Sequence, residues 1–311
     1  MNRKYAFAGL FLIVWMLLPA SVAGDELADI QEKGQIVFGA DTTYPPFEFI
    51  SEKTDKPIGF SVDLGIKIAE QLNVSAAFKT STWDGIIPNL RAQEFDAILS
   101  SMTITVERSI QVSFSTPYFN SSQAILVADG NPKGINGPAD LLKSGVVVGV
   151  QLGTTSDAYI TNTTKPDSEI VRTEGFDELY QKLDIGDVDV ILGDAPVVGY
   201  AATTGSVSGE VVGTFGDVEP FGIAVRVGEG TTLTAINNAI AKLFKDGTYD
   251  NIAECWFGYR PLHTTAPASN DCNFGEVKYI TDKSSAPVDT FAFLGGMTLI
   301  ATLALIKKRR T

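Results

Sequence analysis

The sequence predicts an α/β protein made of two similar lobes, and two observations support this prediction. Short apolar runs of strand length alternate with segments of helical periodicity, which is typical of mostly parallel sheets covered by helices. In addition, one helix–turn–strand segment occurs twice, because residues 83–101 align without a gap on residues 176–194. The alignment pairs Asp96 with Asp189. A repeat of this size indicates two related α/β halves.

The elements of the first half follow from apolar runs, helical periodicity and turn residues. Gly34 is expected to end the first helix, and Asp63 is expected to cap the second. The prediction comprises helices at 27–33 and 63–72, strands at 36–40, 74–79 and 95–99, and a hairpin of 47–50 with 57–60.

The second half continues the alternation up to about residue 258. The predicted strands are 124–128, 146–150, the end of the repeat, and a lone strand at 221–225. Helices are predicted at 139–143, 233–244 and 247–256. Three further helices are predicted after the Gly turn at 153–156, in the second copy of the repeat, and from residue 195 onward. Residues 261–287 are rich in Thr, Ala, Pro, Ser and Asp, which predicts an extended, solvated spacer.

Both ends of the chain are expected to lie outside this fold. Two basic residues, an apolar run and small residues before position 24 predict a secretory signal peptide at 1–23. Residues 288–306 are apolar and residues 307–311 are basic, which predicts a membrane anchor with a cytoplasmic tail. A removable sorting tail is the alternative. The chain between the two ends is expected outside the cytoplasm.

Charge and cysteine content narrow the function classes. The formal net charge is −13, which excludes nucleic acid as an ordinary partner because phosphate binding needs basic patches. Cys255 and Cys272 lie in the part expected to be exported, where a disulfide is the default. Two free buried thiols are the alternative.

Polar side chains follow the predicted strand at 95–99, including Ser101 and Thr103. Thr105 is the expected N-cap of the next helix, so Arg108 falls in the first turn, where the helix dipole disfavours a cation. A guanidinium beside hydroxyl groups suits a small carboxylate, which it can hold with two hydrogen bonds. A structural salt bridge is the alternative role for Arg108.

In the second copy of the repeat, Asp194 occupies the position of Ser101. One lobe then offers hydroxyl groups and a cation, and the other offers a carboxylate. A ligand with a carboxylate and an ammonium would fit between them, and a free α-amino acid is the smallest common one. Capping of the following helix is the alternative role for Asp194. The turn at 153–156 could bind the same ligand carboxylate, although most such junctions bind nothing.

Six motifs carry a resemblance to a known family: DTTYPPF from residue 41, GFSVDL from 59, WDGIIPNL from 83, SMTITVER from 101, GTT from 153 and GTY from 247. Over residues 34–259 the chain resembles the extracellular solute-binding proteins of polar amino-acid ABC transporters, which include glutamine, histidine and lysine/arginine/ornithine binders.

The resemblance implies a two-lobed periplasmic-binding-protein fold of type II, with two strand crossings as hinge. The crossings are expected at 122–128 and 221–225. The expected domains are the signal peptide 1–23, lobe 1 from 24–122 and 222–260, lobe 2 from 123–221, the spacer 261–287, the membrane anchor 288–306 and the basic tail 307–311.

The resemblance also implies a ligand-binding site. Arg108 would hold the α-carboxylate, with Thr103 and the Thr155 backbone. Asp194 would hold the α-ammonium, with Ser101. The ligand side chain would be held by Tyr44, Trp83, Asp41 and Gln151.

Within this implied site, Tyr44 and Trp83 would sandwich the ligand side chain, and Asp41 and Gln151 would face its tip. A core aromatic is the alternative role for Trp83. An aromatic pocket with one carboxylate favours a cationic or amide side chain. The expected protein is a monomer without cofactor or metal that binds a free polar amino acid and delivers it to an ABC permease.

Two other functions remain open. A cyclohexadienyl dehydratase resembles the same fold, but the only histidine, His263, lies in the predicted spacer, so no histidine-based catalytic or metal constellation is expected in the cleft. An input subunit of an amino-acid receptor is the second alternative.

Overall fold

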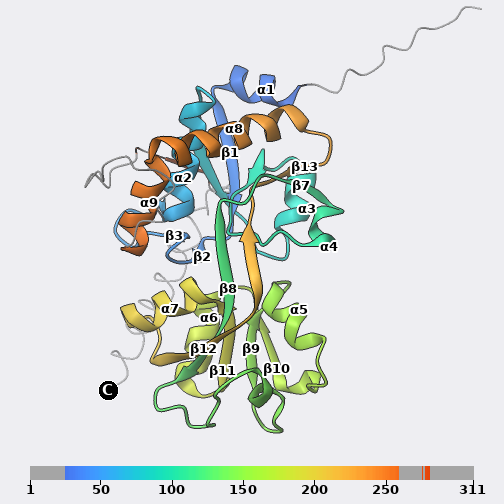
Figure 1. The fold of residues 1–311 in the computed structure, drawn as a ribbon, viewed down its shortest axis with the longest axis vertical. Helices are drawn as coiled ribbons and strands as arrows, with labels where there is room; N and C mark the ends of the chain where they lie inside the picture. The colour runs from blue at the N-terminus through green and yellow to red at the C-terminus, as the bar shows by residue number, and fades with distance from the viewer. Residues whose placement is uncertain (1–24, 259–274, 276, 281–311) are drawn as a thin grey trace, which may run out of the picture.

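The computed structural model describes residues 25–258, 275 and 277–280. Its strands form a six-stranded sheet, a five-stranded sheet and a small three-stranded sheet. The six-stranded and five-stranded sheets belong to two lobes that lie one above the other in Figure 1, and two long strands run between the lobes.

Lobe 1 is built around the six-stranded sheet. Its strand order is β14 (Lys278–Ile280), β5 (Ser75–Thr80), β1 (Gln35–Ala40), β6 (Ala97–Ile98), β13 (Ala224–Arg226) and β7 (Val112–Phe114). The first four strands are parallel to one another, and β13 is antiparallel to both β6 and β7. The helices are α1 (Glu26–Lys33), α2 (Phe60–Gln71), α3 (Ile86–Arg91), α4 (Val106–Ser109), α8 (Gly230–Asp246) and α9 (Thr248–Phe257).

Lobe 2 is built around the five-stranded sheet. Its strand order is β10 (Ile170–Thr173), β9 (Val148–Gln151), β11 (Val190–Asp194), β8 (Phe119–Ala128) and β12 (Gly209–Phe221). Its helical segments are η1 (Pro138–Leu142), α5 (Thr155–Thr161), η2 (Asp167–Glu169), α6 (Phe176–Ile185) and α7 (Ala195–Thr204). The small third sheet is a hairpin-like unit of β2 (Thr43–Tyr44), β3 (Glu48–Ile50) and β4 (Pro57–Ile58).

The sequence repeat corresponds to the same structural unit in both lobes. The helix–strand pair α3–β6 in lobe 1 matches α6–β11 in lobe 2. The paired aspartates even make the same contact, since Asp96 Oδ2 accepts from the Val37 amide at 2.7 Å and Asp189 Oδ2 accepts from the Val147 amide at 2.8 Å. Each carboxylate therefore ties the entry of its strand to the neighbouring strand.

The hinge consists of β8 and β12, which pair antiparallel along their length. The predicted crossing at 122–128 lies in β8, but the predicted crossing at 221–225 is placed too late, because β12 ends at Phe221 and the chain then enters β13 of lobe 1. The long strand at 209–221 was missed because it is largely exposed and rich in glycine and acidic residues, which favour a turn.

An aromatic cluster fixes the lobe 1 ends of both crossing strands. Phe119 of β8 stacks on Phe221 of β12 with ring centroids 5.7 Å apart, and Phe47 packs edge-on against both rings. Phe60 and Phe257 complete the cluster. Because Phe47 directly follows the loop at 41–46, the cluster also positions that loop near the hinge.

Two local predictions require correction. Asp63 does not cap α2, which begins at Phe60 after Gly59; the Asp63 carboxylate instead accepts from the Trp256 indole at 2.6 Å. The predicted spacer is not solvated throughout, because β14 extends the lobe 1 sheet by pairing in parallel with β5. This strand was missed because the composition of a segment does not show that it can pair with a free sheet edge formed by distant residues.

The remaining predictions on the chain ends lie outside the described residues. These are the signal peptide at 1–23, the anchor at 288–306 and the tail at 307–311. Among the residues that are described, no helix is long and apolar enough to cross a membrane. Cys255 is not a free thiol, but Cys272 lies outside the described residues, so the predicted pairing stays a prediction.

Gly59 provides a test of how α2 is joined to the loop that precedes it. Its φ is +132°, and a Cβ atom there would lie 2.1 Å from the Phe47 carbonyl oxygen. We expect Gly59→Ala to lower the free energy of unfolding by about 2 kcal/mol or more, measured by denaturant titration.

Gly199→Ala is the matched control, because Gly199 lies inside α7 and a Cβ there meets no atom within 4 Å. This change should stabilise the protein by roughly 0.5–1 kcal/mol. Equal effects of the two substitutions would contradict the packing of α2 against Phe47.

Candidate functional site

All nine predicted site residues line one cavity between the lobes, together with Ser100 and Thr154. The cavity is small in this closed form, with about 20 Å³ open to the centres of water-sized molecules. Lobe 1 contributes the loop after β1, the loop before α3 and the segment after β6, whereas lobe 2 contributes the ends of β9 and β11 and the start of α5. The sequence analysis therefore brought together side chains that are up to 153 positions apart, from Asp41 to Asp194.

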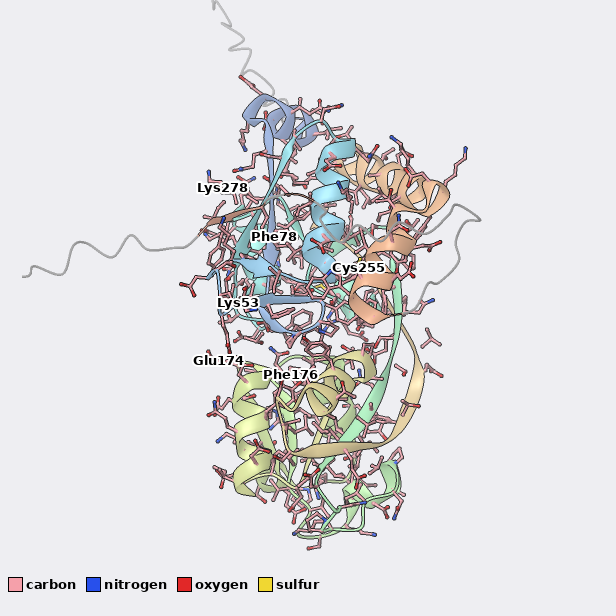
Figure 2. All side chains as sticks on the ribbon, turned by 90° about the vertical axis from the view of Figure 1, so that its left-hand side faces the viewer. Lys53, Phe78, Glu174, Phe176, Cys255 and Lys278 are labelled. Carbon is pink, nitrogen blue, oxygen red and sulfur yellow. The ribbon has the colours of Figure 1, made fainter. Side chains whose placement is uncertain are left out.

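The two lobes touch each other across this cavity. The Tyr44 hydroxyl of lobe 1 donates to Asp194 Oδ2 of lobe 2, and the Gln151 amide of lobe 2 donates to Asp41 Oδ2 of lobe 1. The Trp83 indole also donates to the Gly153 carbonyl at 3.1 Å. The lobes are also in apolar contact, because Phe176, labelled in Figure 2, packs edge-on against Tyr44 with ring centroids 5.2 Å apart. The structure is therefore a closed form.

Arg108 is positioned by the cap of α4. The Thr105 side chain accepts from the Arg108 amide, as the sequence predicts, and the Arg108 guanidinium donates to the Thr103 carbonyl at 2.9 Å. Its Cζ atom lies 5.0 Å from the centroid of the Trp83 ring, a cation–π contact that keeps the guanidinium plane against the cavity wall.

Within the described residues, no carboxylate lies within ion-pair distance of Arg108. The alternative of a structural salt bridge is therefore not realised there. Burial lowers the pKa of Arg108, while the charges of Glu219 and Asp194 act in the opposite direction. The group remains a cation at physiological pH because the pKa of a free guanidinium exceeds about 12.

Trp83 is half-buried, so that it lines the cavity and also packs against a buried apolar cluster of lobe 1. One face of its ring is occupied by Arg108. The ring therefore orients the guanidinium in this closed form, a contact that the sequence did not indicate.

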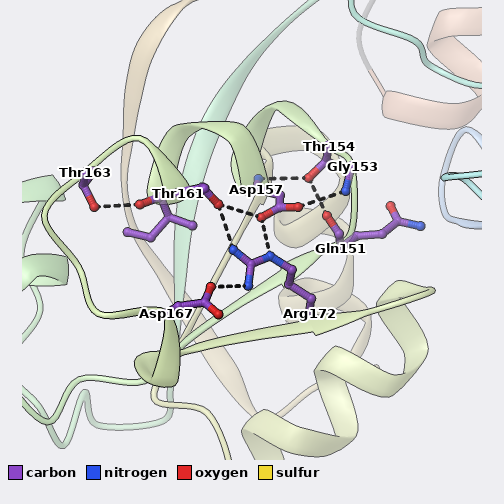
Figure 3. Close-up of polar contacts among 9 residues, drawn as sticks. Gln151, Gly153, Thr154, Asp157, Thr161, Thr163, Asp167 and Arg172 are labelled. Carbon is purple, nitrogen blue, oxygen red and sulfur yellow. Dashed lines mark hydrogen bonds and ion pairs between the residues drawn. The ribbon is translucent and has the colours of Figure 1, made fainter.

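The loop between β9 and α5 is held in place from below, as Figure 3 shows. Thr154 caps α5 by accepting from the Asp157 amide at 3.2 Å, and the Asp157 carboxylate accepts from the Gly153 amide at 3.0 Å. Arg172 of β10 donates to the same carboxylate at 2.7 Å. This network fixes Thr154 and Thr155 at the cavity wall.

Asp194 ends β11 and precedes α7, but its side chain makes no capping hydrogen bond to that helix. Instead its Oδ1 atom accepts from the Ser121 hydroxyl at 3.1 Å and from the Gln123 amide at 3.3 Å, and its Oδ2 atom accepts from Tyr44. Burial raises the pKa of Asp194 to about 7, and the hydrogen bond from Tyr44 moderates the shift.

Asp41 lies 5% exposed at the cavity wall. Its Oδ1 atom accepts from the Thr43 amide at 3.2 Å and the Thr43 hydroxyl at 2.9 Å. The side-chain amide of Gln151 donates to Asp41 Oδ2 and also to the Glu174 carbonyl, the latter at 2.7 Å. Burial raises the pKa of Asp41, whereas the hydrogen bonds lower it. The pair forms a polar patch from opposite lobes.

Glu48 is a residue beneath the cavity that the sequence analysis missed. It is fully buried and accepts from the Ser100 hydroxyl at 3.3 Å and the Ser101 hydroxyl at 3.1 Å. Desolvation raises its pKa well above the usual range. Because Ser101 donates its hydrogen downward to Glu48, its lone pairs are free for a donor in the cavity. The signal in the sequence was an acidic residue between two phenylalanines in a predicted strand.

Other missed residues lie on the crossing strands. Ser121 and Gln123 of β8 hold Asp194, and Glu219 of β12 accepts from the hydroxyls of Thr103 and Thr155. Only knowledge of how β8 pairs with β11 and with β12 could have placed them near the cavity. No group of His, Cys, Asp and Glu suited to hold a metal ion occurs within residues 25–258, 275 and 277–280.

Several known proteins are similar in sequence to this chain over most of its length. ABC transporter arginine-binding protein 1 of Escherichia coli K12 is 33% identical over 250 residues, which cover 79% of this chain and 98% of the relative. L-cystine-binding protein TcyJ of the same strain is 35% identical over 269 residues, which cover 82% and 98%.

Solved structures of amino-acid-binding proteins are also similar to this chain in fold and sequence. An ancestral arginine-binding protein bound to arginine is 40% identical with a TM-score of 0.67, covering 72% of this chain and 99% of that one. AncCDT-1, described as an ancestral amino acid-binding protein and a precursor of cyclohexadienyl dehydratase, is 37% identical with a TM-score of 0.68, covering 75% and 99%. The predicted type II periplasmic-binding-protein fold is thereby confirmed. Residues 36–259 match the model of one family over most of the chain, and the chain belongs to that family, the bacterial extracellular solute-binding proteins, family 3.

Proposed function

We propose that the protein captures a free polar L-amino acid between its lobes. The observation that carries this proposal is the placement of Arg108 from lobe 1 and Asp194 from lobe 2 in the wall of one cavity, without an ion pair between them. A zwitterion would supply each charge with its missing partner. Buried ionic groups are stabilised when they are paired and hydrogen-bonded, so such a ligand would relieve the cost of both charges.

In this proposal Arg108 and Thr103 bind the α-carboxylate, and the backbone at Thr155 contributes from the opposite lobe. Asp194 binds the α-ammonium, and Ser101 supports it because its lone pairs are available to a donor. Tyr44, whose hydroxyl lies on Asp194, must yield or share that carboxylate when the ammonium arrives. The bound ligand would add an ion pair with Arg108 and an ion pair with Asp194.

The Asp41–Gln151 pair is the proposed contact for the tip of the ligand side chain. A carboxylate and an amide oxygen favour a hydrogen-bond donor, so a cationic or amide side chain fits better than an acidic one. The relatives named above bind arginine or cystine, and an ancestral arginine-binding protein has also been solved bound to glutamine. L-arginine is therefore the first ligand to test.

Binding and closure are coupled in this mechanism. A ligand that touches both lobes interacts fully with the closed form alone, so it shifts the hinge equilibrium toward closure. We propose that an ABC permease recognises the closed shape. We further propose that the protein is exported by its signal peptide, is held near the permease by the segment at 288–306, and carries a Cys255–Cys272 disulfide.

We infer binding without chemical turnover. The neighbouring ancestral structure is itself described as an amino acid-binding protein, although it is a precursor of a dehydratase. Incubation with prephenate or arogenate should leave the substrate unchanged, and product formation above the buffer rate would contradict this inference.

Substitution of the two charged anchors tests the site. We expect Arg108→Ala and Asp194→Asn each to weaken L-arginine binding at least about 100-fold in titration calorimetry, because each leaves one ligand charge unpaired in a buried site.

The matched controls are Arg91→Ala and Asp187→Asn, which alter exposed charges in the same lobes. They should leave the affinity within about twofold. Circular dichroism and melting temperature establish that all four variants are folded, and an anchor variant that is folded and binds as tightly as wild type would contradict the site.

The pKa of about 7 for Asp194 predicts a pH dependence. The ammonium prefers the ionised carboxylate, so binding favours loss of the Asp194 proton. Affinity should fall as the pH drops below 7, approaching tenfold per pH unit, and should level off above about pH 8.

Calorimetry in buffers of different ionisation enthalpy should show proton release on binding near pH 6.5. Proton uptake, or an affinity that stays constant between pH 5.5 and 8, would show that Asp194 does not meet the ammonium.

A further inference from the structure

Trp83 stands at the boundary between the cavity and an open groove on its outer side. The cavity and the groove share four wall residues, Trp83, Arg108, Thr154 and Thr155. Gly153 lines the groove beside them. The contact between Trp83 of lobe 1 and Gly153 of lobe 2 therefore lies at the mouth of the cavity, where the two lobes meet.

The indole ring of Trp83 makes two contacts at this mouth. Its Nε1–H group donates to the Gly153 carbonyl of lobe 2 at 3.1 Å. One face of the ring lies against the Arg108 guanidinium, which also donates to the Gly153 carbonyl, at 3.4 Å. One carbonyl oxygen of lobe 2 therefore accepts from two donors of lobe 1, and the ring keeps these donors side by side.

The Gly153 carbonyl is held in place by its own lobe. The Gly153 amide donates to the Asp157 carboxylate at 3.0 Å, as Figure 3 shows. The next peptide group, which contains the Gly153 carbonyl, is held because the Thr154 amide donates to the Gln151 carbonyl at 3.4 Å. Gly153 joins the two peptide groups with a φ of +75°, a left-handed conformation that glycine adopts at little cost. Lobe 2 thus presents an oriented acceptor to Trp83.

The hydrogen bond between Trp83 and Gly153 links different lobes, so it forms only when the lobes come together. In the mechanism proposed above, ligand binding drives that approach. The first encounter of a ligand with the open cleft does not involve this bond. Its contribution to affinity therefore lies in slower reopening and a lower dissociation rate constant.

We propose that Trp83 is a latch at the mouth of the ligand cavity. On closure its indole N–H group binds the Gly153 carbonyl while its ring covers the mouth beside Arg108, so the ligand leaves after this bond has broken. Trp83 thereby sets the lifetime of the complex, whereas the two charged anchors set which kind of ligand is bound. The inference rests on the proposed function and adds a kinetic role to a residue expected only to contact the ligand side chain.

Stopped-flow kinetics test the latch. Lys53 and Glu174 are exposed residues of opposite lobes, both labelled in Figure 2, and a dye pair attached there on the full chain reports opening and closing by energy transfer. The decisive variant carries 3-benzothienylalanine at position 83, which keeps the bicyclic ring but has sulfur in place of the N–H group. We expect its dissociation rate constant for L-arginine to rise about three- to tenfold, with the association rate constant within about twofold of wild type.

Two further variants control for the ring and for the loss of an indole N–H group. Trp83→Phe, which also lacks the N–H group but has a smaller ring, should dissociate at least as fast as the benzothienylalanine variant. Trp256→Phe is the matched control, because the Trp256 indole donates to Asp63 within lobe 1. It should leave both rate constants within about twofold of wild type. A wild-type dissociation rate constant in the folded benzothienylalanine variant would overturn the latch.

Hydrogen exchange of the indole N–H groups tests the bond itself in protein labelled with ¹⁵N-tryptophan. Saturating L-arginine should slow exchange at Trp83 at least about tenfold, and should change exchange at Trp256 less than about twofold. Trp83→Phe and Trp256→Phe assign the two signals. Exchange at Trp83 that is equally fast with and without bound L-arginine would overturn the latch.

The failure of the latch and the failure of the proposed function give different results. If wild type binds L-arginine but loss of the N–H group changes neither opening nor dissociation, the latch alone fails. If L-arginine changes neither energy transfer nor melting temperature in wild type, the choice of ligand fails, and the same measurements are made with whichever of the twenty amino acids raises the melting temperature. If none of them does, the proposed function fails and the latch fails with it.

Discussion

The proposed function depends on two opposite charges that face one cavity from different lobes, the half-buried Arg108 and the buried Asp194. Arg108 is held by the Thr105 cap and the Trp83 ring, and Asp194 is held by Ser121, Gln123 and Tyr44. Both are costly to bury without a partner, as the raised pKa of Asp194 reflects. A folded protein tolerates such a cost when a ligand removes it, so the arrangement is suited to binding a zwitterion.

The surrounding fold keeps these charges on separate bodies. Each lobe has its own sheet, and an aspartate of the repeat, Asp96 or Asp189, ties neighbouring strands together in the same way. The lobes are joined by β8 and β12, whose lobe 1 ends are fixed by Phe119 and Phe221. In the proposed function, two lobes on a two-stranded hinge allow ligand contacts in the cavity to change the overall shape, which an ABC permease would recognise.

The sequence predicted those parts of the site that lie where a strand ends and a helix begins. The repeat indicated that Ser101 and Asp194 occupy equivalent positions in the two lobes. The predicted Thr105 cap placed Arg108 in the first turn of the helix that follows β6. What it missed depends on pairing between distant segments. Glu219 reaches the cavity because β12 pairs with β8, and β14 forms because residues 278–280 pair with β5. Neither pairing can be recognised from the hydrophobic periodicity of a single sequence.

The most direct test of the account is a crystal structure of the protein with L-arginine bound. The account predicts the α-carboxylate within hydrogen-bonding distance of the Arg108 guanidinium and the α-ammonium within hydrogen-bonding distance of the Asp194 carboxylate, in a closed cleft. An amino acid bound in the reverse orientation, or in a cavity that contains only one of the two charges, would contradict it.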